Sequence, residues 1–194
     1  MNALIVDGTR DILLTILVKD DGIYSRKSLR AGGRHSALLF VHIDELFGEA
    51  ELSVRDIDYF AGVVGPGSYT GIRIGACALT AMARALSKRL VSMDALEVLA
   101  YSKGLRGGGN YICLIDNGHD YYALQEQNGE KKYFVLPKEL AANYENKFFR
   151  DENEYYIDGI VGLVRDKIAR GEYGSEIRPF YMKKSQAEQK FSGG

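Results

Sequence analysis

The sequence predicts a duplicated α/β fold, in which two related lobes each combine a mixed sheet with flanking helices. The chain begins with short apolar segments separated by polar turns, which is the pattern of a β-hairpin. The same order of strand, aspartate, turn and strand returns in the second half, where Asp116 takes the place of Asp7. We therefore expect lobes at residues 1–105 and 106–194, with the glycine-rich residues 106–110 at their boundary.

Apolar runs bounded by Asp and Gly turn residues predict the elements of each lobe. In the first lobe these are strands at residues 3–6, 12–18 and 22–29, a helix at 36–49, a strand at 57–64, a helix at 70–88, and a strand at 91–94 that opens a helix reaching residue 101. In the second lobe they are strands at 111–115, 121–125 and 132–136, a helix after Pro137, a strand near 155–158, and a helix at 160–170.

Composition limits the class of protein. The chain has 194 residues, 46% of them hydrophobic and 26% charged, and its formal net charge of −1 argues against a dedicated nucleic-acid binder. Cys77 and Cys113 lack the spacing of a redox or zinc motif, which indicates reduced thiols in a cytoplasmic protein. No signal peptide opens the chain, and no apolar run reaches the roughly 18 residues of a membrane-spanning helix, so we expect no membrane association.

The histidines argue against a metal or catalytic site. If His35 and His42 lie on one helix, about 10 Å of helix axis separates them, which is too far for two ligands of one ion. His119 falls in a turn, and no Ser–His–Asp arrangement can be assembled around it. We therefore predict no catalytic and no metal-ligating residues.

A glycine-rich loop precedes the helix at residues 70–88. Its glycines permit positive φ or close backbone approach, and Ser68 is a natural helix cap. The free N–H groups of such a helix start can hold an anion. However, the loop lacks the Gly-Lys-Ser/Thr of a P-loop, and its glycine spacing does not fit the dinucleotide-binding fingerprint.

The helix at 70–88 has more apolar surface than one core contact requires. Its small and apolar residues cover an arc of roughly 220°, about twice the width that a surface helix needs. The helix at 36–49 also has a surplus. The surplus favours contact with a second subunit, although the chain itself could cover the longer helix on both sides. The candidate contact residues are Phe40, Val41, Ile43 and Phe47 in the first helix, and Gly71, Ile74, Gly75, Ala78, Ala81 and Ala85 in the second.

The loop and its helix carry a specific resemblance. Gly65-Pro-Gly-Ser-Tyr-Thr-Gly-Ile-Arg-Ile-Gly75 closely resembles the GPGSFTGLRIG signature of the bacterial TsaB (YeaZ) family. Further matches occur in the family's order: Ile5-Val-Asp-Gly-Thr9, Arg34-His-Ser36, Ser92-Met-Asp-Ala-Leu96 and Pro179-Phe-Tyr-Met182. The second lobe departs from the pattern, because Asp116-Asn-Gly-His119 stands where the family has Asp-Ala-Arg-Arg.

The resemblance implies an actin-like (ribonuclease H-like) duplicated fold and a non-catalytic role in making threonylcarbamoyladenosine next to the tRNA anticodon. It implies a TsaD-like catalytic subunit as partner, a TsaE-like ATPase as a further partner, and self-pairing of the chain when it is alone. The same two apolar helices would form the contact, and tRNA would be met only through the complex. The chain alone would require no cofactor. ATP or ADP could bind at the subunit junction, with Asp7, Thr9 and Ser68 as the candidate contacts.

Two enzyme alternatives stay open from the sequence. One is an actin-like ATP-dependent phosphotransferase or ATPase, which would need ATP turnover that depends on Asp7. The other is a peptidase-like enzyme, which would need a nucleophile with a base or a metal.

Overall fold

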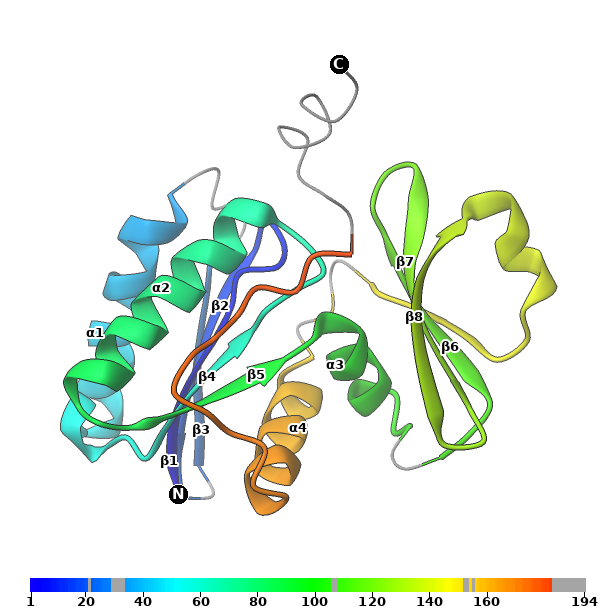
Figure 1. Ribbon diagram of the computed structural model, residues 1–194. Coiled ribbons are helices and arrows are strands. Elements are labelled where there is room, and N and C mark those ends of the chain that lie inside the picture. The colour runs from blue at the N-terminus through cyan, green and yellow to red at the C-terminus, as the bar shows by residue number, and fades with distance from the viewer. Residues whose placement is uncertain (21, 29–33, 106–107, 152–153, 155, 183–194) are drawn as a thin grey trace.

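The fold consists of two mixed sheets with helices on and between them (Figure 1). The computed structural model describes residues 1–20, 22–28, 34–105, 108–151, 154 and 156–182. Parts of three predictions, at residues 29, 106–107 and 155, lie outside these ranges, as do residues 183–194 at the end of the predicted second lobe. Within them, no helix combines the length and apolar character that crossing a membrane requires.

The first sheet has the strand order β3-β2-β1-β4-β5. Its strands are β1 (Asn2–Asp7), β2 (Leu13–Lys19), β3 (Gly22–Ser28), β4 (Tyr59–Val63) and β5 (Arg89–Met93). The first three strands form an antiparallel meander, while β4 runs parallel to β1 and β5 parallel to β4. This sheet confirms all five strands predicted for the first lobe.

The second sheet repeats the first part of this plan with the order β8-β7-β6-β9. It contains β6 (Tyr111–Asp116), β7 (Asp120–Gln127), β8 (Glu130–Pro137) and β9 (Lys147–Phe149). Again the first three strands form an antiparallel meander, and the fourth pairs in parallel with the first. The repeated order confirms the predicted duplication.

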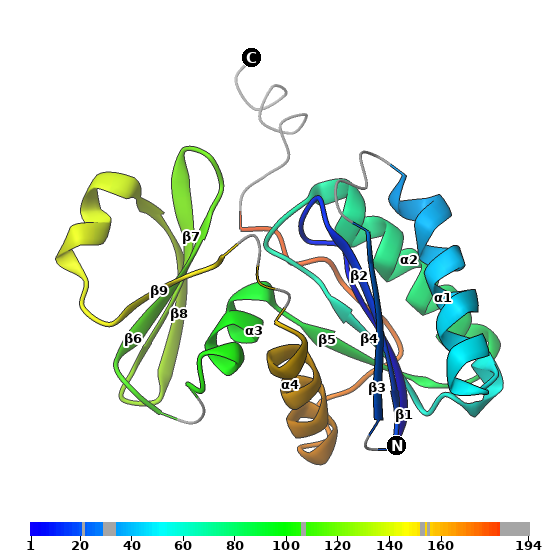
Figure 2. The ribbon, with the colours of Figure 1, turned by 180° about the vertical axis from the view of Figure 1, so that it is seen from behind.

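Helices cover both faces of the first sheet (Figure 2). The helices α1 (His35–Ala50) and α2 (Tyr69–Ala85) pack on one face, and α3 (Ala95–Ser102) and α4 (Ile157–Ala169) lie between the two sheets. Successive residues of β1 divide between these layers, because side chains alternate along a strand. Leu4 and Val6 belong to the core with α1 and α2, whereas Ile5 belongs to the core with α3 and α4.

Late residues of the chain return to the first sheet. The backbones of Leu90 and Gly174 pair, and the Phe180 amide donates to the Val64 carbonyl at 2.8 Å. Ile177 is buried in the core beneath α2. In Figure 1 this segment runs from α4 back across the first sheet. The division into residues 1–105 and 106–194 therefore stays a proposal about the two sheets, since α4 and the returning segment contact the first of them.

Two details predicted for the second lobe are wrong. The segment after Pro137 is a 3-10 helix, η2 (Lys138–Asn143), and not an α-helix. The strand expected near 155–158 is absent from its described residues, because Ile157 and Asp158 already belong to the first turn of α4. The buried side chains that follow have the spacing of a helix, and the strand that pairs with β6 is the three-residue β9.

Candidate functional site

The turn after β1 brings together the three candidate nucleotide contacts. Asp7 is buried at the end of β1, and its Oδ1 accepts hydrogen bonds from the Thr9 amide (2.8 Å) and the Thr9 hydroxyl (2.7 Å). The Thr9 carbonyl in turn accepts from the Ser68 amide at 2.6 Å. Asp7 thus closes its own turn, and that turn holds the start of the glycine loop.

The glycines of the loop allow close contact between two backbone segments of the same chain. A Cβ on Gly67 would lie 2.1 Å from the Thr9 carbonyl oxygen, and one on Gly71 would lie 2.1 Å from the carbonyl oxygen of Gly8. Ser68 caps α2 as predicted, because its hydroxyl accepts from the Gly71 amide at 3.3 Å. The loop therefore packs α2 onto the end of β1 and needs glycine where it does so.

The outer sides of α1 and α2 expose apolar residues from the predicted contact set. Phe40 is 57% exposed and Val41 is 51% exposed, which is unusual for large apolar side chains. Ala81 and Ala85 are exposed on α2. We call these four residues and their half-buried neighbours Phe47, Ile74 and Ala78 the α1–α2 face.

The other predicted contact residues point into the chain's own core. Ile43 is buried beneath α1. A Cβ on Gly75 would lie 3.2 Å from Val6 of β1, and Gly71 packs on Gly8 as described above. The close backbone approach that Gly71 permits is therefore to the turn after β1 of the same chain. The functional proposal below rests on the α1–α2 face alone.

Polar contacts fix which side of α1 faces outward. His42 is buried and is hydrogen-bonded through Nδ1 to Thr15 of β2 (3.2 Å) and through Nε2 to Ser28 of β3 (2.6 Å). Arg26 of β3 forms ion pairs with Glu45, at 3.0 Å, and with Glu49. These contacts hold one side of α1 on the sheet edge, while Phe40 and Val41 are exposed to solvent. Sequence reasoning left the role of His42 unassigned.

An aromatic–arginine cluster stands at the beginning of α2. The Arg73 guanidinium lies 3.8 Å from the centre of the Tyr69 ring, and its Nε donates to the Tyr181 hydroxyl at 2.9 Å. The two rings stack with centroids 5.0 Å apart. Beside the cluster, α2 and residues 176–179 border a cavity of about 370 Å³. No local sequence pattern predicts this cluster, because Tyr181 lies far from α2 along the chain.

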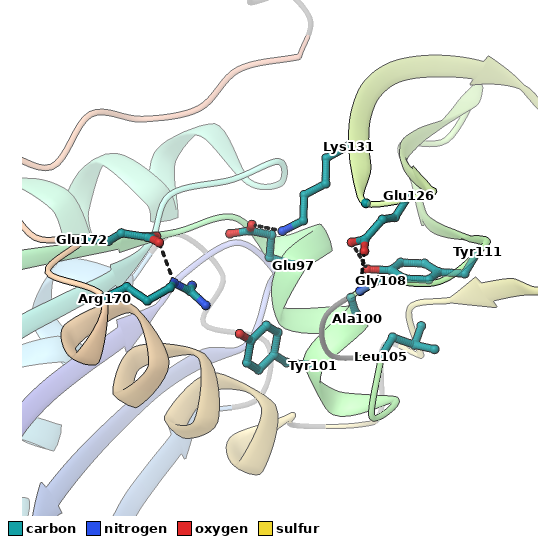
Figure 3. Close-up of a pocket in the computed structure, with 11 residues that line it drawn as sticks. Glu97, Ala100, Tyr101, Leu105, Gly108, Tyr111, Glu126, Lys131, Arg170 and Glu172 are labelled. Carbon is teal, nitrogen blue, oxygen red and sulfur yellow. Dashed lines mark hydrogen bonds and ion pairs between the residues drawn. The ribbon is translucent and has the colours of Figure 1, made fainter.

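A second cavity, of about 500 Å³, lies between α3, the β7–β8 hairpin and the end of α4 (Figure 3). Glu97 and Lys131 form an ion pair across it at 2.6 Å, and Arg170 pairs with Glu172 at 2.6 Å. Glu126 accepts from the Gly108 amide (2.9 Å) and the Tyr111 hydroxyl (2.7 Å). The charged groups around this cavity thus bond to the protein itself. No group of three or more potential metal ligands occurs among the residues that the structure describes.

A family model described as TsaD, tRNA N6-adenosine threonylcarbamoyltransferase, matches residues 26–193. This chain belongs to the TsaD family. Among curated proteins, this TsaD-family chain is 25% identical over 148 residues to a tRNA N6-adenosine threonylcarbamoyltransferase of Prosthecochloris aestuarii. It is 26% identical over 132 residues to the tRNA threonylcarbamoyladenosine biosynthesis protein TsaB of Bacillus subtilis. These matches bear out the resemblance to TsaB (YeaZ).

The lengths of the matched regions differ between the two kinds of relative. The alignment with the Prosthecochloris transferase covers 72% of this chain and 42% of the relative, so the chain spans less than half of that protein. The alignment with Bacillus TsaB covers 66% of this chain and 57% of the relative.

Solved structures agree on the fold. YeaZ from Pseudomonas aeruginosa matches with a TM-score of 0.70 at 20% identity, covering 93% of this chain and 99% of YeaZ. A second structure, described as similar to the peptidase YeaZ from Pseudomonas aeruginosa, matches with a TM-score of 0.72 at 20% identity and covers 94% and 99%. Together with the repeated strand order, this likeness confirms the expected actin-like α/β fold with two mixed sheets.

Proposed function

We propose that this chain is a non-catalytic, TsaB-like subunit of the machinery that forms threonylcarbamoyladenosine in tRNA. It binds a TsaD-like catalytic subunit through the α1–α2 face. The observation that carries the proposal is the exposure of the large apolar residues Phe40 and Val41 on α1, together with that of the small residues Ala81 and Ala85 on α2. An apolar face of this kind on a soluble domain marks an interaction site.

The residue types of the face support a helix-to-helix contact. The exposed residues of α1 are large and those of α2 are alanines, so that a helix of the partner can approach α2 closely while packing against α1. The alignment with nearly all of YeaZ, but with 42% of a transferase relative, also favours the role of a partner subunit.

The remaining parts of the proposal concern the assembly around this contact. A TsaE-like ATPase joins the complex, tRNA is bound only through the complex, and the chain pairs with itself when no partner is present. The site proposed for ATP or ADP is the subunit junction near Asp7, Thr9 and Ser68, which the turn after β1 holds together. The chain acts in the cytoplasm.

The substitution Ala81→Glu tests the contact, because it places a charge at an exposed position of α2. We expect the affinity for a purified TsaD-like subunit, measured by titration calorimetry, to fall about tenfold or more, since a charge would be buried in an apolar interface. The matched control is Ala142→Glu, an exposed alanine of η2 in the second lobe, which should bind like the wild type. Equal affinity of Ala81→Glu and the wild type would reject the proposed face.

A further inference from the structure

The helix α1 carries acids and no lysine or arginine. Two of these acids, Glu45 and Glu49, form ion pairs with Arg26 of β3. The third, Asp44, is exposed and forms no ion pair with any residue that the structure describes. Because Asp44 follows Phe40 by four positions, the two side chains lie on the same side of the helix. The outer side of α1 thus combines a large apolar group with a negative charge that is not neutralised within the described chain.

The helix α2 shows the opposite charge pattern. It has no acidic residue, and its charged residues are Arg73 and Arg84. The Arg73 side chain is held by Tyr69 and Tyr181, as described above. The Arg84 guanidinium is exposed and makes no hydrogen bond or ion pair with the part of the chain that the structure describes. Arg84 is therefore a cation that is available to a partner.

The cavity of about 370 Å³ beside α2 connects this cation with the α1–α2 face. Arg84 and Ala81, one turn apart on α2, both line it, together with the apolar side chain of Ile177. The acid that lines it, Glu176, forms an ion pair with Arg178 at 3.1 Å. A cavity with apolar walls and an arginine without a counter-ion suits an apolar segment that carries a carboxylate.

The chain itself contains such a segment, because α1 carries Asp44 one turn from the exposed Phe40. In a two-fold pair, a contact from α1 of one copy to α2 of the other is matched by the same contact in reverse. A face with one sign of charge would repel its own copy, whereas Asp44 on α1 and Arg84 on α2 attract each other in both contacts. The two helices of one chain contact each other and still leave both charges unpaired among the described residues.

We propose that two copies of this chain pair with α1 of each copy against α2 of the other, and that Asp44 of one copy forms an ion pair with Arg84 of the second. This inference rests on the self-pairing in the proposed function and names the charges that select it. The apolar groups around Phe40 supply most of the affinity. Ion pairs at an exposed interface add little affinity, so the two charges mainly fix which helices meet.

Reversing the charge on each helix tests the contact, with association of the full chain followed by sedimentation velocity. Asp44→Arg leaves only cations at the proposed contacts, and Arg84→Asp leaves only anions, so each variant alone meets like charges. We expect the dissociation constant of each variant to rise about tenfold or more relative to the wild type. An equimolar mixture of the two variants restores opposite charges in both contacts and should associate about as tightly as the wild type.

The matched control reverses two exposed charges of β8 in the second sheet, with Glu130→Arg and Lys132→Asp. Each control should associate like the wild type, both alone and in the mixture. A mixture of Asp44→Arg and Arg84→Asp that associates no better than its components would overturn the ion pair.

The outcome also separates this inference from the proposed function. A wild-type chain that does not associate would overturn the pairing of copies. The contact with a TsaD-like subunit would still stand in that case if Ala81→Glu weakened the binding of that subunit.

If either reversal is poorly folded by circular dichroism, the neutral variants Asp44→Asn and Arg84→Gln replace the reversals. Each removes one charge from both ion pairs, so its association should depend less on salt concentration than that of the wild type. The same salt dependence in the wild type and in both neutral variants would overturn the proposal.

Discussion

His42 shows how a single buried side chain decides the orientation of a helix. Its two ring nitrogens bond to Thr15 and Ser28, on two different strands. Burial lowers its pKa, although Glu45 acts in the opposite direction. Because burial favours the neutral ring, His42 stabilises the fold fully above its ordinary pKa of 6.5. This contribution is lost as the pH falls through the lower pKa that His42 has in the folded state.

Replacing His42 by glutamine should remove part of the acid sensitivity of the fold. We expect the free energy of unfolding to fall by about 1 kcal/mol at pH 7, because a hydrogen bond is lost. Between pH 6.5 and pH 5 the variant should then lose less stability than the wild type, as measured by urea denaturation. His119→Gln, at an exposed turn, is the control and should keep the wild-type pH dependence. A wild-type slope in His42→Gln would contradict this role.

At the scale of residues, the sequence could place a side chain on an element but could not say where it points. Asp7, Thr9 and Ser68 lie together in the structure, and their role as nucleotide contacts stays a prediction. The helical wheel could not separate Gly75, which packs on Val6, from exposed Ala81. Both are small, and only the position of the sheet decides which side of a helix is covered.

Self-pairing is the prediction that belongs to the α1 and α2 elements. Sedimentation velocity over a range of concentrations should show that the wild-type chain associates when no partner is present. Phe40→Asp should be monomeric at the same concentrations, because it puts a charge at the most exposed large apolar position of α1.

The chain offers a matched control in the second lobe. Phe149 of β9 is also a half-exposed phenylalanine, at 46%, and Phe149→Asp should associate like the wild type. A wild type that stays monomeric, or a Phe40→Asp variant that associates equally well, would contradict pairing through α1.

Regular elements with long apolar patterns were predictable, and short ones were not. The strands of both meanders and the four helices follow from apolar spacing and turn residues. The three residues of β9 carry no periodic signal, and their strand conformation depends on pairing with β6. The segment after Pro137 likewise forms a 3-10 helix where the α-helical pattern was too short to decide.

At the scale of the molecule, duplication explains the two sheets, while packing explains why the lobes do not separate cleanly along the chain. α3 and α4 fill the space between the sheets, and the segment that ends at Phe180 returns to β4 and β5. Such long-range contacts leave no local trace in the sequence. The boundary near residue 105 therefore separates the two sheets along the chain, but residues from both sides of it contribute to one core.

The most direct measurement of the proposed function is threonylcarbamoylation of tRNA by a reconstituted system that contains a TsaD-like subunit, with and without this chain. We predict that product forms at a useful rate only when the chain is present. Ala81→Glu should lower the rate about tenfold, which corresponds to about 1.4 kcal/mol, whereas Ala142→Glu should not. Full activity in the absence of the chain would contradict the account.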